Sequence, residues 1–172
     1  KSEIQKNRQI IKDKFNNFFE WVKGADLVSL KECNTNEDPV RPELDNEFRT
    51  SYGRKIYGVQ YKNEIHAIMC FAFTNEIPKS VDELDKLSKD AFLQSTLRGQ
   101  KVGKIAIAYT VWSKKKGGGK LIVKEVFKMI KKSNHLNRLV TLSPLTEMAT
   151  KFHLRNKAKL ISVNEETQNF EY

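Results

Sequence analysis

The segment IAIAYTVWSKKKGGGKLIVKEVFKMIKK, residues 105–132, decides the fold. Its first part, residues 105–112, is apolar on both faces of an extended chain apart from Thr110, which is typical of a strand buried in the centre of a sheet. Its last part, from about Lys120 to Lys132, has apolar residues on one side of a helix and lysines on the other, so it predicts a helix that packs on that sheet.

The loop between this strand and helix has the composition of an anion-binding site. Three consecutive glycines let backbone N–H groups turn toward one point, and the first turn of the helix adds unpaired donors and the positive end of its dipole. Such a nest suits a phosphate or a pyrophosphate. A mobile, solvated surface loop is the alternative. The loop residues are Lys114, Lys115, Lys116, Gly117, Gly118, Gly119 and Lys120.

Two common phosphate motifs do not fit this loop. A Walker A loop requires Ser or Thr after the Gly-Lys pair, but Leu121 follows Gly119-Lys120, and the first glycine of that motif is missing. A Rossmann fingerprint requires a third glycine where Ile122 stands. The phosphate ligand therefore belongs to another class of site.

Composition limits the classes of protein further. The 172 residues suit one domain, residues 1–172, and 31 Lys and Arg against 21 Asp and Glu give a net charge of +10, which indicates a polyanionic partner. No apolar run approaches the roughly 20 residues of a membrane span, and the polar start does not resemble a signal peptide. Cys33 and Cys70 form no CxxC motif, so we expect a reducing cytoplasm. The Lys- and Asn-rich usage is common in AT-rich genomes, including those of phages.

The rest of the chain predicts a mixed sheet with helices. Ser2 to Gln5 fits a capping box, and an apolar stripe then runs to Gly24, which predicts a packing helix over residues 1–24. Residues 52–61 and 64–73 predict an antiparallel hairpin with its turn at Lys62-Asn63. The further expectations are a short strand or turn at 27–30, a loop at 31–50, a helix after Ser80, strands at 101–112 and 137–142, a helix at 146–156 and one or two strands in 158–172. This order predicts an α/β (α+β) domain with a mixed, mostly antiparallel central sheet flanked by helices.

The spacing Lys114-x-x-Gly117-x-Gly119 after a buried strand resembles the Gln/Arg-x-x-Gly-x-Gly/Ala pyrophosphate loop of the GNAT superfamily of acyl-CoA N-acyltransferases, with Lys114 in place of Gln or Arg. The resemblance implies that the backbone of the preceding strand binds the pantetheine arm of acetyl-CoA or another acyl-CoA, and that the loop amides bind its pyrophosphate. On that strand we expect contacts from Tyr109, Val111 and Trp112, of which Tyr109 and Trp112 could wall an acyl pocket, although core packing is the alternative.

The last third resembles the catalytic domain of malonyl-CoA decarboxylase, which is itself GNAT-like. The segments LVTLSP, residues 139–144, and FHLRNKA, residues 152–158, carry the resemblance, with Lys157 where that family has Gly. It implies that Ser143 and His153 are the catalytic serine and histidine, with Asn156 in the same segment. Residues 1–172 do not include the helical N-terminal domain of that family, and only nine residues separate Ser143 from His153, where that family has a long insertion.

The residues themselves leave alternatives open. Ser143 is held extended by Pro144 and either faces a cleft or caps the next helix. His153 is an acid or base if it faces the cleft, and a satisfied surface or core histidine otherwise. The resemblance to GNAT enzymes implies a further role, because at this offset they tend to carry a Tyr that protonates the leaving thiolate. Glu76 is a candidate base acting through water, or a solvated loop carboxylate. No histidine has a partner at metal-ligand spacing, so we expect no metal.

Three functions follow as hypotheses. The first is an acyl-CoA-dependent N-acyltransferase, acting with acetyl-CoA on an unidentified amine, and the second is a malonyl-CoA decarboxylase-like enzyme using Ser143 and His153. The third is a nucleic-acid-directed protein of phage type, including a DNA base-modifying enzyme, with lysines as phosphate contacts. The sequence shows no aromatic-basic stacking pattern for that role. It leaves the oligomeric state open, and it leaves an acidic macromolecule or a nucleic acid open as the acceptor.

Overall fold

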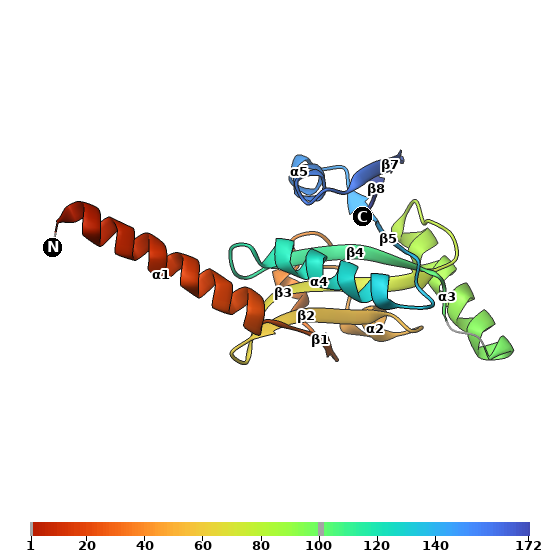
Figure 1. Ribbon diagram of the computed structural model, residues 1–172. Helices are drawn as coiled ribbons and strands as arrows, with labels where there is room; N and C mark the ends of the chain where they lie inside the picture. Colours follow the sequence, from red (N-terminus) through yellow and green to blue (C-terminus); the bar gives the residue numbers. More distant parts are fainter. Residues whose placement is uncertain (1, 100–101) are drawn as a thin grey trace.

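The computed structural model describes residues 2–99 and 102–172. These residues form one open, eight-stranded sheet with helices on both faces (Figure 1). The strands along the sheet run in the order β1-β2-β3-β4-β5-β8-β6, and β7 pairs with β8. The elements are α1 (Glu3–Gly24), β1 (Asp26–Leu30), η1 (Thr35–Glu37), α2 (Asn46–Thr50), β2 (Lys55–Tyr61), β3 (Glu64–Thr74), α3 (Val81–Arg98), β4 (Ile105–Ser113), α4 (Gly118–Lys132), β5 (Arg138–Thr141), β6 (Ser143–Pro144), α5 (Glu147–Arg155), β7 (Lys159–Val163) and β8 (Thr167–Glu171).

The predicted fold class is confirmed, and the topology explains why the sheet is mixed. Strands β1 to β4 form an antiparallel meander, and in the described chain the parallel pairing is confined to β4 and β5. Helix α4 makes the crossover that a parallel pair requires. The Lys62-Asn63 turn has both residues at positive φ, as the tight hairpin turn demands.

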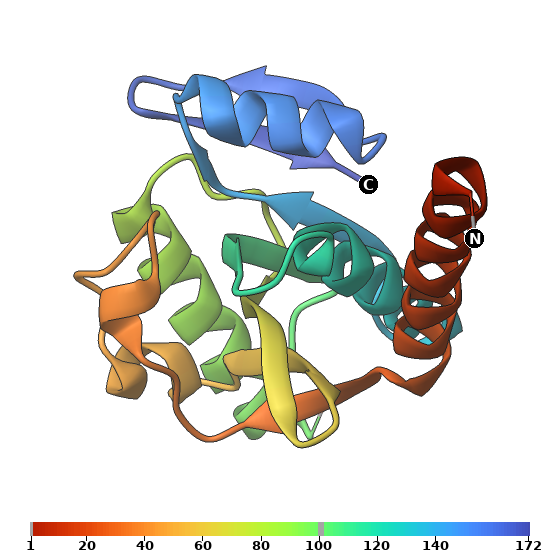
Figure 2. The same cartoon turned by 90° about the vertical axis from the view of Figure 1, so that its left-hand side faces the viewer.

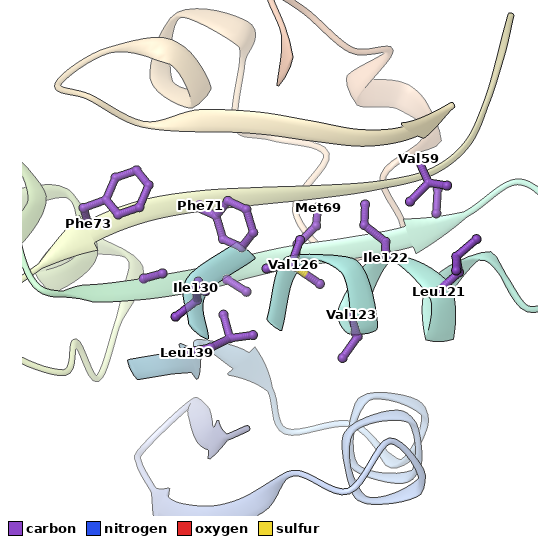
Figure 3. Close-up of a cluster of buried hydrophobic side chains, with 13 residues drawn as sticks. Val59, Met69, Phe71, Phe73, Leu121, Ile122, Val123, Val126, Ile130 and Leu139 are labelled. Atoms are coloured by element: carbon purple, nitrogen blue, oxygen red, sulfur yellow. The ribbon is translucent and has the colours of Figure 1, made fainter. Parts of the chain in front are cut away.

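The core has two layers because side chains alternate across the central strands. Met69 and Phe71 of β3 point to the face that α4 covers, where they pack against Ile122 and Val126 (Figure 3). Cys70, between them, points to the opposite face, which α2 and α3 cover. Strand β4 is buried on both faces, as the sequence predicts for a central strand.

A β-bulge marks the point where the sheet opens. Thr110 pairs with Cys70 and Ala108 pairs with Phe71, so Tyr109 is an extra residue with no partner on β3. The parallel pairing of β4 with β5 also ends here, at Ala108 opposite Thr141. Bulges bend a strand and are frequent beside functional sites. Beyond Tyr109, β4 and the chain that follows β5 are no longer paired, which leaves space between them.

Helix α1 forms as predicted but does not pack as predicted. The Ser2 capping box is present, yet the helix projects from the domain (Figure 1), and Ile4, Ile11, Phe15 and Phe18 are 55–67% exposed. Trp21 in its last turn is half-buried against the core. An apolar stripe shows that one side of a helix can pack, but not that this chain supplies the partner.

Several element boundaries correct the sequence-based expectations. Residues 31–50 are not simply a loop, because Asn34 caps η1 and Asp45 caps α2 with their side chains. Strand β4 begins at Ile105, and Lys101, its expected first residue, lies outside the described residues. Helix α5 and the β7–β8 hairpin lie together at one end of the molecule, as Figure 2 shows in blue.

A candidate active site between the diverging strands

A cavity of about 450 Å³ lies where β4 and β5 diverge. Its wall comes from β4, the first turn of α4, the segment around η1, and the chain from the end of β5 into α5. The described residues that line it are Glu37, Pro39, Val40, Ala108, Tyr109, Thr110, Val111, Trp112, Ser113, Gly119, Leu142, Ser143, Pro144, Thr146, Met148, Ala149, Phe152 and His153. Most of these side chains are apolar, and none is a lysine or an arginine.

The structure brings together six of the residues that the sequence singles out: Tyr109, Val111, Trp112, Gly119, Ser143 and His153. It leaves others outside the cavity lining. Asn156 ends α5 and donates from its side chain to the carbonyl of Phe152 at 2.8 Å, which is a capping role. Glu76 lies after β3, where its carbonyl accepts a hydrogen bond from the Thr74 hydroxyl at 2.6 Å.

His153 is held by aromatic neighbours at the edge of the cavity. It is 6% exposed, its ring stacks on Phe170 with 5.0 Å between centroids, and its Nδ1 lies 2.7 Å from the hydroxyl of Tyr172. Burial lowers the pKa of His153 to about 4, so the imidazole is neutral at pH 7. Nε2 is the ring nitrogen left without a partner in the described part of the chain.

Ser143 is equally buried but belongs to a different hydrogen-bond chain. Its hydroxyl lies 2.8 Å from that of Thr141, which accepts the backbone N–H of Phe170. The helix cap is Thr146, whose side chain accepts the N–H of Ala149, so Ser143 does not cap α5. Ser143 and His153 share a cavity wall, but no hydrogen bond joins them within residues 2–99 and 102–172.

The three loop glycines are required for three different reasons. Gly117 has φ of +83°, a left-handed conformation that favours glycine. A Cβ on Gly118 would lie 2.9 Å from the carbonyl oxygen of His66, and one on Gly119 would lie 2.8 Å from the ring of Phe152. The chain therefore packs closely against both a strand and α5 here.

The loop offers fewer free amides than the sequence suggests. The amides of Lys114 and Lys115 donate to the carbonyl of His66, and that of Gly118 donates to the carbonyl of Lys115. The first-turn amides of Gly119 and Lys120 have no acceptor in the described chain. The donors that the loop leaves free are therefore at the N-terminus of α4, with lysine side chains around them. Lys114 is already paired, with its Nζ 2.9 Å from Glu37.

Buried charged side chains contact the residues that line the cavity. They lie in the segment 31–50, which the sequence predicts to be a loop. The Arg41 guanidinium donates to the carbonyl of Tyr109 at 3.0 Å and to that of Leu142 at 3.1 Å, so it bridges β4 and the chain after β5 where the ladder has ended. Asp38 accepts the Thr110 hydroxyl at 2.7 Å and pairs with Arg49 at 2.9 Å. Asn34 and Pro39 are typical of a loop, and nothing in the local sequence marks Asp38 and Arg41 as buried.

Among the residues that the structure describes, no group of three or more His, Cys, Asp or Glu side chains could hold a metal ion. None of their helices is long and apolar enough to cross a membrane.

Comparison with known proteins identifies the fold. No protein-family model matches the sequence, and no curated protein does. Among solved structures, the GNAT-like decarboxylase GphF in complex with isobutyryl-CoA is similar over 86% of this chain and 98% of its own, with 9% identity and a TM-score of 0.63. An acetyltransferase from Bacillus subtilis in complex with CoA is similar over 86% and 95%, with 10% identity and a TM-score of 0.54.

A third similar structure is malonyl-CoA decarboxylase from Cupriavidus metallidurans, with 21% identity over 80% of this chain and a TM-score of 0.49. This chain spans 36% of the length of that protein. Together with the sheet topology, the comparisons show that the chain has the GNAT superfamily fold.

Proposed function

We propose that the chain is an enzyme that binds an acyl-CoA and activates its thioester carbonyl beside His153. The observation that carries the proposal is that one cavity joins the first turn of α4, through Gly119, to Ser143 and His153. The N-terminus of α4 would bind the pyrophosphate, and the diverging strands would take the pantetheine arm and acyl group. Neighbouring structures of the same fold contain CoA or acyl-CoA, which supports this ligand.

His153 acts in this proposal as a neutral hydrogen-bond donor. When the Tyr172 hydroxyl donates to Nδ1, the ring proton lies on Nε2, which then donates to the thioester oxygen. A neutral imidazole can polarise a carbonyl and stabilise an enolate oxygen. With a pKa of about 4 it is a poor imidazolium acid at pH 7. This role therefore differs from protonation of a leaving thiolate, the role expected from the sequence.

The lack of Lys and Arg side chains among the described lining residues favours decarboxylation of a malonyl-type thioester. The bond between the carboxylate carbon and the α-carbon breaks, its electron pair forms the thioester enolate, carbon dioxide leaves, and a proton from solvent then adds to the α-carbon. An apolar wall without Lys or Arg side chains leaves the substrate carboxylate weakly stabilised, while His153 stabilises the enolate that replaces it.

N-acyl transfer is the second candidate, and Glu37 is the observation that supports it. A protonated amine must lose a proton before it attacks, and Glu37 is the only carboxylate among the described lining residues. Its ion pair with Lys114 at 2.9 Å already occupies one of its two oxygens. The cavity therefore supports decarboxylation better than transfer to an amine.

The test is turnover of malonyl-CoA compared with acetyl-CoA. Calorimetry with CoA should first show binding at micromolar to sub-millimolar levels, weakened by Gly118→Glu. Released carbon dioxide and acetyl-CoA should then appear from malonyl-CoA, and His153→Ala should lower that rate at least about 100-fold while it retains CoA binding. Loss of acetyl-CoA only when amines are added, with no carbon dioxide from malonyl-CoA, would establish transfer instead.

A further inference from the structure

A second cavity of about 450 Å³ lies apart from the first, on the other side of the glycine loop. The last turns of α1, the β2–β3 hairpin and the loop before α4 surround it. We call it the Trp21 cavity. Its aromatic side chains are Phe18, Trp21, Tyr61 and His66, and its lysines are Lys62, Lys115 and Lys116.

The aromatic rings of the Trp21 cavity are fixed in place. The Trp21 indole N–H donates to Nδ1 of His66 at 2.8 Å, and the two rings stack at 25° with centroids 5.8 Å apart. Tyr61 meets the edge of His66 at 85°, and the Lys62 ammonium lies 5.3 Å from the centre of the Tyr61 ring. Rings held in this way give a planar ligand a surface on which to stack without further ordering.

Exposed lysines border the Trp21 cavity, and further exposed lysines lie along α4. Lys62, Lys115 and Lys116 are exposed at its rim, opposed by the exposed Glu64. From the loop, a ridge of exposed lysines follows α4, whose 15 residues span about 22 Å. On α4, Glu125 opposes the ridge with an ion pair to Lys128 at 3.6 Å. The ridge consists of Lys120, Lys124, Lys128, Lys131 and Lys132.

We propose that the Trp21 cavity is a stacking site for an unpaired base of a single-stranded nucleic acid, whose neighbouring phosphates lie along the rim lysines and the α4 ridge. Aromatic platforms beside a positively charged track are the means by which proteins bind single strands without sequence preference. The ridge is longer than one nucleotide, so it suits a chain of phosphates rather than the few phosphates of one CoA. This proposal does not rest on the acyl-CoA chemistry proposed above.

The absence of an aromatic-basic pattern in the sequence has a structural explanation. Trp21, Tyr61 and Lys115 come from segments that are far apart in the chain and meet only when the last turn of α1 packs beside the hairpin. Each segment alone carries one or two of the required side chains. The platform is therefore a tertiary feature that no local motif could reveal.

Fluorescence of Trp21 gives a direct test. The chain has two tryptophans, so Trp112→Phe leaves Trp21 as the only one. Titration of this variant with a 16-nucleotide single-stranded DNA of mixed sequence should quench and saturate the emission. Affinity should fall steeply between 50 and 200 mM salt because bound phosphates release counterions. A duplex of the same length should bind without comparable quenching, because its bases are already stacked.

Substitutions in the Trp21 cavity test whether the nucleic acid binds there, and a folding check accompanies each variant. Tyr61→Ala and Lys62→Glu should each weaken binding about 10-fold, measured by anisotropy of a labelled strand. Lys159→Glu on β7 is the matched control, because it makes the same charge change at an exposed position away from the cavity. Its affinity should stay within about 2-fold of the parent. Circular dichroism of each variant shows whether it is folded, and Lys62→Glu tests the site if Tyr61→Ala does not fold.

Three results would overturn the proposal. The first is equal loss of affinity in Lys62→Glu and Lys159→Glu, which would indicate net charge alone. The second is quenching of Trp21 by CoA but not by the oligonucleotide, which would assign the cavity to the nucleotide end of a cofactor. The third is tighter binding of duplex than of single strand, which would exclude a role for stacking.

Discussion

The Tyr172 hydroxyl lies 2.7 Å from Nδ1 of His153, and the two rings meet at 70° with centroids 5.8 Å apart. Tyr172 follows β8 directly, and its backbone N–H donates to the carbonyl of Leu139 on β5. The C-terminal hairpin thus brings to the candidate active site a side chain that fixes how His153 is oriented. This makes Tyr172 a positioning residue in the proposed mechanism.

Replacement of Tyr172 by Phe tests that relationship. The ring still packs beside His153, but nothing then holds Nδ1, so the population with the proton on Nε2 falls. We expect kcat for malonyl-CoA decarboxylation to fall about 10-fold, equivalent to about 1.4 kcal/mol, with KM changed less than about 2-fold. Steady-state kinetics measures both constants. If kcat stays unchanged and kcat/KM falls about 10-fold because KM rises, the result would contradict the positioning role.

Burial of His153 predicts a pH dependence of stability. Its pKa is lowered from 6.5 to about 4, so between these values the unfolded chain binds a proton that the folded chain does not. The free energy of unfolding should therefore decrease as pH falls from 6.5 toward 4, by about 3 kcal/mol in all from this residue. Its contribution is fully present above pH 6.5.

Urea unfolding at pH 7.5 and 4.5 checks this expectation. His153→Gln removes the titrating group and serves as the reference, because other titrating residues then cancel in the difference between the two proteins. The stability advantage of the parent over this variant should shrink at the lower pH. A difference that is independent of pH would show that His153 is not buried as a neutral ring.

The parts of the fold that could be predicted are those set by local periodicity. The apolar centre of β4, the hairpin turn at Lys62-Asn63 and the capping residues Ser2 and Ser80 act within a few residues of sequence, so the chain itself displays them. The direction in which α1 projects depends instead on which surfaces the rest of the chain leaves available. A stripe such as that of α1 carries no information on this point.

The residues of the candidate site likewise fall into two groups: those that short local motifs indicate, and those whose roles depend on tertiary contacts. Gly119, Ser143 and His153 could be named because they lie within short motifs that resemble known enzymes. The interacting residues Arg41, Asp38 and Tyr172 were missed, because their roles arise from contacts across 19 to 101 positions of sequence. Asn156 is the converse case, since it lies in a resembling motif, and its side chain here donates to the carbonyl of Phe152 at the end of α5.

Cys33 provides a prediction about chemical reactivity. A hydrogen bond from Cys70 is the main cause that lowers the pKa of the half-exposed Cys33 thiol to about 7, whereas Cys70 is fully buried and its pKa is raised. Iodoacetamide should alkylate Cys33 first, with a rate that rises through pH 7, because the thiolate is the nucleophile. Peptide mass spectrometry of samples quenched over time measures both sites.

A Cys70→Ala variant provides the control for Cys33. Without the donor, the midpoint of the alkylation rate of Cys33 should move above pH 8, toward that of an ordinary thiol. An unchanged midpoint near pH 7 would assign the effect to another neighbour. Faster labelling of Cys70 than of Cys33 in the folded parent would contradict the burial pattern itself.

Lys157 provides a test of backbone strain. It follows Asn156 at the end of α5 and has φ of +73°, in the left-handed region that a side chain disfavours. Lys157→Gly should therefore stabilise the protein by about 1 kcal/mol, or about 3 °C in Tm.

Lys151→Gly is the matched control, because it makes the same replacement in the middle of the same helix at an exposed residue paired with Glu147. That variant should lose about 1 kcal/mol, since glycine is a poor helix former. Thermal unfolding of both variants beside the parent measures the two shifts. Equal destabilisation by both would show that residue 157 does not hold the left-handed conformation in solution.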